Sequence, residues 1–452
     1  MLENTYAVIG HPIAHTMSPF IHARLFSLNS IQAEYGILDI PPENLAKRMD
    51  TLRSLRGFNI TIPHKQAIIP LLDGLDSKSV FYHSVNTVQN RNGHLTGFTT
   101  DGTGFCKALE AGGAKLDGRT VILGAGGAGR VMAFEAAMCG GTVTIAVRPH
   151  GIESARQLCA DIQSKVKNAK ADFCLLDEIR GEMDLLANAT PVGMYPNTEA
   201  RPVSEEIIRN AACVFDAVYN PNETLLLRTA RKNGVRAIGG ISMLVWQAAA
   251  AQEIWYGAKF RNEDIETLCA DAVFEMKKTF GNLVLCGFMG SGKTTVGNLL
   301  ARKSGRTFVD MDQYIEQEQG VCISELFASK GEAEFRKLER EAAKGLGQKS
   351  GLVIATGGGA LLDPENTEEL KRNGVVLFLD ASLERIRERL AGDLTRPLLS
   401  GPEPEEKMCR LYRERFERYR AAADIKIPAD APADEVAEQI LRLLKNPLTP
   451  SE

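Results

Sequence analysis

A glycine-rich stretch in the middle of the chain, LVLCGFMGSGKTTVGNLLA at 283–301, has residues suited to binding phosphate. Gly287, Gly292, Lys293 and Thr294 follow the spacing G-x-x-x-x-G-K-T. Such glycines let backbone N–H groups curl around phosphate oxygens, and the next helix adds partial positive charge from its N-terminus. The lysine can reach the β- and γ-phosphates, and the threonine hydroxyl can hold Mg²⁺. An apolar strand precedes this loop and a helix follows it, so the sequence predicts nucleotide binding by Gly290, Ser291, Gly292, Lys293, Thr294 and Thr295.

Several later segments could bind the molecule that accepts a phosphoryl group. Asp310 and Asp312 stand two apart at the end of the expected strand TFVDMD, so both can project from the same edge. Arg336 lies in the helical segment GEAEFRKLE, three residues before Glu339, which could pair with it. The expected strand LVIAT is followed by glycines 357–359, whose bare backbone lets a small ligand approach closely.

Taken in order, the phosphate loop, D-x-D, G-E-x-x-F-R, G-G-G and R-P-L-L resemble the shikimate kinase family over about residues 281–445. The resemblance implies ATP and Mg²⁺ as cofactors and shikimate as the acceptor. The roles it implies are Mg²⁺ binding by Thr294 and Asp310, catalysis by Lys293, Asp312 and Arg396, substrate binding by Asp312, Arg336, Gly358, Gly359 and Arg415, and nucleotide binding by Arg389 and by Arg396 on a lid. Arginine forks suit a carboxylate substrate, and a loose phosphoryl transition state needs a well-positioned hydroxyl more than a strong base.

A second glycine-rich turn, GAGGAG at 124–129, contains G-x-G-x-x-G between an expected strand at 120–123 and an Ala-rich helix. In this context the motif predicts dinucleotide binding. About 20 residues later an NAD site usually has an acid, but the segment AVRPH offers Arg148, which suits a 2′-phosphate. The sequence therefore favours NADP(H) over NAD, with cofactor contacts from Gly124, Ala125, Gly126, Gly127, Ala128, Gly129, Arg148 and Gly240.

The first hundred residues carry short polar side chains in turns, which could each match one polar atom of a polyhydroxy acid. The segments GHPIAHTMSPFIHARLF, GFNITIPHK, SVNTV and GFTTDGTGF carry them, and together with NATPVGM, FDAVYNPNET and GGISMLVWQAA they resemble the shikimate dehydrogenase family over residues 5–275. The resemblance implies substrate contacts from Thr16, Ser18, Thr61, Lys65, Asn86, Asp101, Tyr219 and Gln247. It also implies that Lys65 and Asp101 form the catalytic pair, in which a protonated Lys65 gives its proton to the ketone and Asp101 orients it. Departures from the family pattern at Thr16, Thr99, Pro191 and the segment AVRP bear on cofactor affinity and on NADP strictness more than on the reaction.

The alternation of expected strands and helices places both sites in α/β folds. We expect a two-lobed dehydrogenase with a Rossmann-like domain, followed by a parallel α/β domain of the P-loop, nucleoside monophosphate kinase-like type. The expected parts are a substrate-binding lobe at 1–101, an NADP-binding domain at 102–240, helices at 241–278 that return to the first lobe, and a kinase domain at 283–446. The segment KKTFGN at 277–282 is the expected boundary.

Composition argues against several other classes of protein. The net charge of −4 and a pI near 6.1 give no electrostatic reason to expect a nucleic-acid or membrane partner. Nine cysteines without a C-x-x-C pair argue against a disulfide framework or a structural zinc site, and they fit a reducing cytosol. No signal peptide and no membrane-spanning run is recognisable. We therefore expect a cytoplasmic enzyme with small-molecule partners, and the sequence leaves its oligomeric state open.

The two resemblances together predict a bifunctional enzyme of the shikimate pathway, which leads to chorismate and the aromatic amino acids. It would reduce 3-dehydroshikimate with NADPH and then phosphorylate the shikimate. Three alternatives remain open at this stage: an NAD-using quinate/shikimate dehydrogenase fused to the kinase, a kinase with an inactive regulatory dehydrogenase-like module, and a P-loop switch protein. Retention of Lys65 and Asp101 argues against the second, and the D-x-D and G-G-G segments argue against the third.

Overall fold

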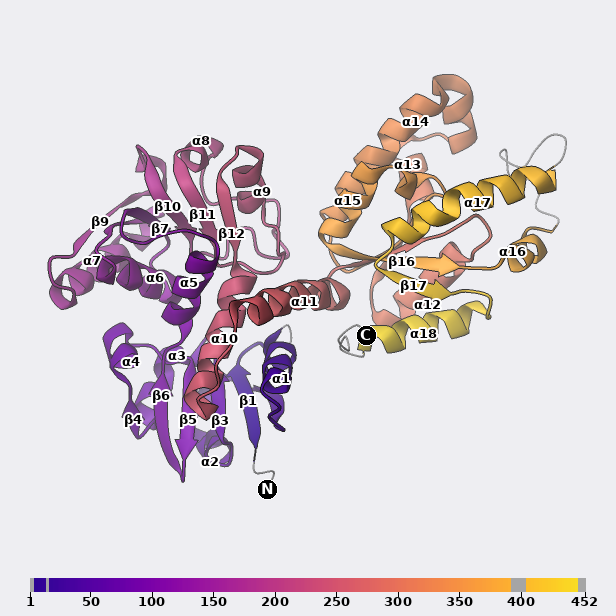
Figure 1. The fold of residues 1–452 in the computed structure, drawn as a ribbon. Coiled ribbons are helices and arrows are strands. Elements are labelled where there is room, and N and C mark those ends of the chain that lie inside the picture. Colours follow the sequence, from indigo (N-terminus) through magenta and orange to yellow (C-terminus); the bar gives the residue numbers. More distant parts are fainter. Residues whose placement is uncertain (1–3, 14–15, 392–403, 446–452) are drawn as a thin grey trace. The chain divides into compact units, whose positions relative to one another are not determined.

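The structure, a computed structural model, describes residues 4–13, 16–391 and 404–445 of the 452-residue chain. The chain divides between Val273 and Phe274 into two compact units, and their elements are labelled in Figure 1. Within the described ranges, no helix combines the length and apolar character that crossing a membrane requires.

The first lobe of the N-terminal unit contains strands β1 (Thr5–Gly10), β2 (Glu34–Asp39), β3 (Gly57–Ile60), β4 (Gly74–Leu75), β5 (Thr87–Arg91) and β6 (His94–Phe98), with helices α1 (Ser18–Leu28), α2 (Met49–Arg53), α3 (His64–Ala67) and α4 (Ser77–Tyr82). The strands form one mixed sheet in the order β2-β1-β3-β5-β6-β4. Strands β5 and β6 make a hairpin, whose turn residues Asn92 and Gly93 both have positive φ.

The second lobe contains β7 (Arg119–Leu123), β8 (Thr142–Val147), β9 (Lys170–Leu175), β10 (Met183–Asn188), β11 (Ala211–Asp216) and β12 (Arg236–Gly239), with helices α5 (Asp101–Ala111), α6 (Gly127–Met138), α7 (Ile152–Lys165), α8 (Glu205–Arg209) and α9 (Leu225–Lys232). All neighbouring strands are parallel, in the order β12-β11-β10-β7-β8-β9. This is the dinucleotide-binding order, in which ligands bind where the strand order reverses, here between β7 and β10. The expected Rossmann-like domain is confirmed.

Helix α10 (Gly240–Tyr256) follows the second sheet and packs against α5 between the two lobes (Figure 1). A side chain at Gly104 in α5 would collide with the carbonyl oxygen of Met243 at 2.6 Å and with the Cβ of Gln247 at 2.9 Å. Glycine at this position therefore lets the two helices approach closely. Helix α11 (Asn262–Phe280) comes next, and its first half packs within this unit through Ile265 and Leu268, which are buried.

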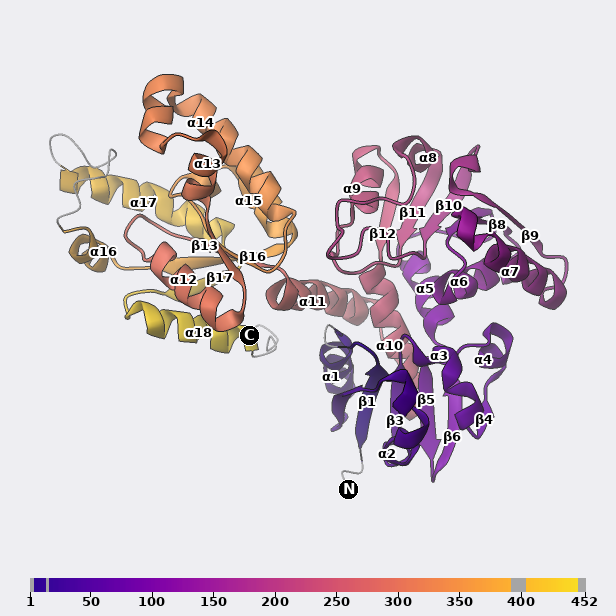
Figure 2. The same ribbon diagram turned by 180° about the vertical axis from the view of Figure 1, so that it is seen from behind.

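The C-terminal unit contains β13 (Asn282–Cys286), β14 (Thr307–Asp310), β15 (Leu352–Ala355), β16 (Gly374–Asp380) and β17 (Ile425–Pro428), with helices α12 (Lys293–Ser304), α13 (Met311–Gln319), α14 (Ile323–Gly347), α15 (Pro364–Arg372), α16 (Leu383–Leu390), α17 (Pro404–Ala422) and α18 (Ala433–Lys445). Its sheet is entirely parallel, in the order β14-β15-β13-β16-β17. Helices α12 and α18 lie on one side of it, and α15 and α17 on the other (Figure 2). The expected parallel P-loop fold is confirmed.

Three strands were not expected from the sequence: β2, β4 and β9. Each lies at an edge of its sheet. An edge strand has only one neighbour and can leave its residues exposed, as β2 does at Glu34, Gly36, Ile37 and Asp39. Such a strand lacks the buried apolar run or the clean alternation that identifies a central strand in a sequence.

The division between the two units falls inside α11, earlier than the expected boundary at 277–282. Phe274 packs against the core of the C-terminal unit, and the Lys277 Nζ donates to the carbonyl oxygen of Lys371 at 2.7 Å. Arg306 Nη2 donates to the carbonyls of Lys278 and Thr279, both at 2.9 Å. The last turns of α11 are thus part of the fold of the C-terminal unit.

We expect a fragment that begins at residue 274 to be clearly more stable than one that begins at 283. The longer fragment keeps Asn282, which is fully buried, donates to the carbonyls of Leu346 (3.1 Å) and Lys349 (2.7 Å), and accepts from the N–H of Leu352 (3.0 Å). Each buried group left unpaired costs about 1–3 kcal/mol, so the shorter fragment should lose about 3 kcal/mol or more. Urea unfolding followed by circular dichroism measures the difference. Asn282→Ala in the longer fragment should reproduce much of it, and equal stability of all three proteins would contradict the expectation.

Candidate active sites

The N-terminal unit brings Lys65 and Asp101 together, although they are far apart in the chain. Lys65 lies in the short helix α3, and Asp101 is the first residue of α5. The Lys65 Nζ donates to Asp101 Oδ2 at 2.6 Å, and the Asp101 side chain is 6% exposed while that of Lys65 is 28% exposed. The carboxylate is therefore fixed inside the protein, and the ammonium group reaches toward solvent from it.

An amide network surrounds this ion pair. The Asn86 Nδ2 lies within hydrogen-bonding distance of Asp101 Oδ1 (2.9 Å), of the Thr100 hydroxyl (3.0 Å) and of Gln247 Oε1 (3.2 Å). Gln247 comes from α10, whose close packing on α5 holds it beside Asp101. Sequence reasoning did not single out Thr100, whose N–H donates to Asn86 Oδ1 at 2.8 Å; its position directly before Asp101 was the available signal.

Two further expected substrate contacts form a turn before α1. The Thr16 hydroxyl donates to the Ser18 hydroxyl at 3.1 Å, and the Ser18 N–H donates to Thr16 Oγ1 at 3.2 Å. Thr61 follows β3, and its N–H donates to the carbonyl of Ile9 in β1. Tyr219 lies in the loop after β11 and is partly buried, which raises the pKa of its phenol. Neither Thr61 nor Tyr219 is joined to the Lys65 network by a hydrogen bond among those the structure describes.

The expected cofactor turn lies at the carboxyl end of β7, at the switch point of the second sheet. Gly124 has a φ of +101° and directly follows β7, and α6 begins at Gly127. Ala125, Gly126, Ala128 and Gly129 complete this turn and open the helix. Arg148 directly follows the neighbouring strand β8 and its side chain is exposed. The turn, its helix and the arginine thus meet at one edge of the sheet, as a dinucleotide site requires.

A buried network at the ends of β10 and β11 was missed by sequence reasoning. Asn188 and Asp216 end these strands and are fully buried. Asp216 Oδ1 accepts from Asn188 Nδ2 at 2.9 Å and from the N–H of Val218 at 3.0 Å, and its Oδ2 accepts from the Thr224 hydroxyl at 2.6 Å. The segments NATP and FDAV contain these residues, but nothing in either segment shows that the two side chains meet.

Burial raises the pKa of Asp216 to about 6, although hydrogen bonds from three uncharged donors each lower it. The folded protein thus holds a proton that the unfolded chain releases near pH 3.8, and the group destabilises the fold as pH rises through about 6. At about 1.36 kcal/mol per pH unit, ionisation of Asp216 costs about 3 kcal/mol at pH 8.

We therefore expect Asp216→Asn to gain stability relative to the natural sequence between pH 4 and pH 8, by up to about 3 kcal/mol. Urea unfolding followed by tryptophan fluorescence measures this, because the two tryptophans, Trp246 and Trp255, both lie in α10 and report on the N-terminal unit alone. A difference between the two proteins that does not change with pH would be inconsistent with a buried titrating carboxyl.

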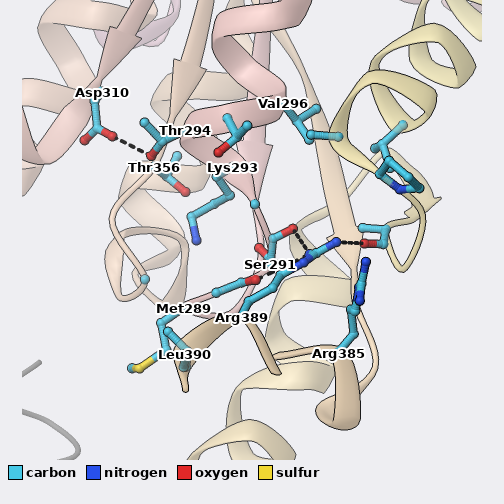
Figure 3. Close-up of a pocket in the computed structure, with 18 of the residues that line it drawn as sticks. Met289, Ser291, Lys293, Thr294, Val296, Asp310, Thr356, Arg385, Arg389 and Leu390 are labelled. Carbon is cyan, nitrogen blue, oxygen red and sulfur yellow. Dashed lines mark hydrogen bonds between the residues drawn. The ribbon is translucent and has the colours of Figure 1, made fainter. Parts of the chain in front are cut away.

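The C-terminal unit has a cavity of about 510 Å³ lined by the phosphate loop (Figure 3). This volume lies in the range of small-molecule sites. All of the expected nucleotide-binding loop residues, the run 290–295, line it. The Lys293 Nζ donates to the carbonyl oxygens of Gly287 at 2.9 Å and Phe288 at 3.1 Å, which places the ammonium group inside the curve of the loop.

The side-chain oxygens of Thr294 and Asp310 lie side by side at the edge of this cavity. The Thr294 hydroxyl donates to Asp310 Oδ2 at 3.0 Å (Figure 3). Asp310 Oδ1 accepts from the N–H of Asp312 at 3.1 Å and so caps the start of α13. We expected Asp310 and Asp312 to project from the same strand end, but Asp312 is the second residue of α13 and Asp310 is the last residue of β14. Both residues nevertheless line the cavity.

The expected carboxylate-binding residues gather around the glycines that follow β15. The Arg415 Nη1 donates to the carbonyl of Gly358 at 3.1 Å, and the Arg336 guanidinium lies against Gly359. Arg336 pairs with Glu339, which is buried, and burial raises the pKa of that carboxyl although Arg336 opposes the rise. The Tyr419 hydroxyl also donates to Gly358, at 2.5 Å. The two arginines thus meet at one backbone segment, close to Asp312, whose Oδ1 lies 2.5 Å from where a Cβ on Gly357 would be.

Arg389 joins two walls of the cavity. Its Nη1 donates to the carbonyl of Ser291 at 3.1 Å, and its Nη2 donates to the carbonyls of Ala429 at 2.9 Å and Ala431 at 3.2 Å (Figure 3). Sequence reasoning missed the segment after β17 and also Arg385, which lines the cavity. Arg396 lies outside the described residues.

Comparisons with known proteins match both halves. The family model of the shikimate dehydrogenase substrate binding domain matches residues 8–88, and that of shikimate kinase matches residues 289–445. A shikimate dehydrogenase (NADP(+)) from Caldanaerobacter subterraneus subsp. tengcongensis is 39% identical over 260 residues, which are 56% of this chain and 92% of that protein.

Solved structures resemble the N-terminal unit. The shikimate 5-dehydrogenase of Thermus thermophilus, in complex with NADP(H) and shikimate, is 35% identical with a TM-score of 0.54, and the match covers 60% of this chain and 99% of that one. A chorismate mutase/shikimate 5-dehydrogenase fusion protein from Clostridium acetobutylicum is 29% identical with a TM-score of 0.54, covering 61% of this chain and 98% of that one. The chain therefore belongs to the shikimate dehydrogenase family through its N-terminal unit and carries a shikimate kinase domain in its C-terminal unit.

Proposed function

We propose that the chain catalyses two consecutive steps on one small ring acid. The N-terminal unit reduces 3-dehydroshikimate to shikimate with NADPH, and the C-terminal unit transfers a phosphoryl group from ATP to the 3-hydroxyl of shikimate. The observation that carries the proposal is that a lysine–aspartate pair beside a dinucleotide fold, and a phosphate loop beside an arginine cluster, occur in the two units of one chain.

In the first reaction a bound NADPH would supply the hydride that adds to the carbonyl carbon of the substrate. Lys65 donates its proton to the carbonyl oxygen, so that one hydride and one proton together give the hydroxyl, and Lys65 regains a proton from solvent. Asp101 orients the ammonium group through the 2.6 Å hydrogen bond. Asn86, Gln247 and the Thr16–Ser18 turn would bind the hydroxyls and carboxylate of the ring. Arg148 would pair with the 2′-phosphate, which is why we propose NADP(H) over NAD.

In the second reaction Lys293 and the N–H groups of the phosphate loop hold the β- and γ-phosphates. Thr294 and Asp310 offer adjacent oxygen ligands of the kind that Mg²⁺ prefers, and a bound Mg²⁺ would neutralise phosphate charge. Asp312 orients the substrate hydroxyl and accepts its proton, while Arg336 and Arg415 bind the carboxylate as planar forks. Arg389 would face the adenine, and we keep Arg396 as the proposed lid arginine by resemblance alone.

A single coupled assay tests the proposal. The full chain is given 3-dehydroshikimate, NADPH, ATP and Mg²⁺, and products are identified by mass. We expect shikimate 3-phosphate, with shikimate accumulating when ATP is left out and no product when NADPH is left out. Parallel reactions with NADH and with quinate separate the cofactor and substrate assignments. Faster turnover with NADH than with NADPH would contradict the role proposed for Arg148. Failure to consume NADPH would contradict the proposed dehydrogenase function.

A further inference from the structure

We propose that Asp216 is a positioning residue for hydride transfer, which holds two loops of the second lobe in place beside the cofactor turn and α10. The inference rests on the proposed dehydrogenase function and adds a residue to it. Asp216 ends β11, and its neighbour Asn188 ends β10, next to the switch point between β10 and β7. Ligands of such sheets bind beyond the carboxyl ends of the strands, which is where both side chains lie.

The network reaches the cofactor turn through Asn188. Asn188 Oδ1 accepts from the N–H of Thr190 at 3.0 Å and from its hydroxyl at 2.6 Å, while Asn188 Nδ2 donates to Asp216. The Thr190 Cγ2 in turn lies 2.8 Å from where a Cβ on Gly124 would be. Because Asp216 offers only acceptors to Asn188, it fixes which way the Asn188 amide points. Thr190 thereby keeps its place against the first glycine of the cofactor turn.

The same network reaches the loop that carries Tyr219 and the start of α10. Asp216 accepts from the N–H of Val218 and from Thr224, so it closes the loop 217–224 at both ends. Thr224 also caps α9 by accepting from the N–H of Leu227 at 3.3 Å. A Cβ on Gly240 would lie 2.5 Å from the carbonyl oxygen of Ala217, so α10 begins directly on the residues after β11. This helix supplies Gln247.

Stability alone does not account for a carboxylate at this position. Asp216 is fully buried, and the partners that the structure gives it are an amide, a backbone N–H and a hydroxyl. A buried charge that meets no opposite charge opposes folding, so its presence favours a functional reason. The network joins the expected cofactor site to α10, the helix that carries the proposed substrate-binding residue Gln247. A small displacement of the cofactor relative to the substrate would slow hydride transfer more than it would weaken the binding of either molecule.

Asp216→Ala and Thr224→Val test the proposal in the full chain. Asp216→Ala removes all three acceptor contacts, and Thr224→Val removes the hydroxyl while keeping the side-chain shape. We expect Asp216→Ala to lower the dehydrogenase kcat by about 10- to 100-fold with a smaller change in KM for the ring acid, and Thr224→Val to do so less. The primary isotope effect on kcat with NADPH deuterated at the transferred position should rise. Asp216→Asn, which can still accept from Asn188 and Val218, should restore most of the rate.

Asp184→Ala is the matched control. Asp184 lies near the opposite end of β10, where its Oδ2 accepts from the N–H of Arg119 at 2.7 Å. Its loss should alter stability without changing kcat or the isotope effect. Kinase activity of each sample gives the amount of intact chain, and tryptophan fluorescence reports whether the N-terminal unit is folded.

The outcomes separate this proposal from the function on which it rests. If the natural chain has no dehydrogenase activity, the proposed dehydrogenase function is wrong. An active natural chain, together with an Asp216→Ala protein whose kcat stays within about twofold or whose isotope effect is unchanged, would show a structural role only. If Asp216→Ala fails to fold, Thr224→Val decides by the same two measurements.

Discussion

Lys65→Ala should abolish the dehydrogenase reaction and leave kinase activity unchanged. The structure gives Lys65 one clear chemical position: its Nζ is 2.6 Å from a buried carboxylate and partly open to solvent, where a ketone oxygen can meet it. Loss of a positioned proton donor costs about 10²- to 10⁴-fold in rate. The kinase residues lie in the other compact unit of the chain.

NADPH oxidation and shikimate-dependent ADP release, measured on the same sample, give both rates. Lys47→Ala is the control, since Lys47 is an exposed lysine of the same lobe. Retention of more than about a tenth of the dehydrogenase rate would mean that another group supplies the proton. Loss of both activities would mean that the two units depend on each other.

Lys293→Ala should have the reciprocal effect, removing kinase activity and sparing the dehydrogenase. Its ammonium lies within the phosphate loop, where we expect it to meet the charge that develops on the transferred phosphoryl group. Removing one such preorganised donor typically costs about 10²- to 10³-fold in kcat. Tryptophan fluorescence should not change, because both tryptophans are in the N-terminal unit.

Lys344→Ala, at an exposed position of α14, is the matched control for this variant. ADP release at saturating ATP and shikimate distinguishes a loss of catalysis from a loss of affinity. A Lys293→Ala protein with normal kcat and raised KM for ATP would assign the lysine to ground-state binding alone.

Contiguous motifs allowed much of both sites to be predicted from the sequence. The phosphate loop and the turn at 124–129 each combine a strand, a glycine-rich segment and a helix, so local pattern also gives their place in the fold. The contact between Lys65 and Asp101 was expected through family resemblance, and the structure brings the two together. The roles of the individual site residues remain predictions.

Contacts between separate loops could not be read in the same way. Asp216, Asn188 and Thr224 meet because β10 and β11 are neighbours in the sheet, and strand order is a tertiary property. Arg389 meets the segment after β17 for the same reason. The unit boundary within α11 left no signal because the helical periodicity continues across it. The separation of Asp312 from the strand edge depended on where β14 ends and α13 begins, which sequence patterns fix poorly.

The bonds from Lys293 to the carbonyls of Gly287 and Phe288 bear on how tightly a nucleotide can be held. The Lys293 side chain, near the end of the loop, is hydrogen-bonded to the first two residues of the loop, so the loop is closed on itself. When a nucleotide binds, Lys293 exchanges these carbonyl partners for phosphate oxygens, and no flexible segment has to become ordered first. The entropy cost of ordering the loop is met during folding and not during binding. More of the attraction for phosphate can therefore appear as affinity.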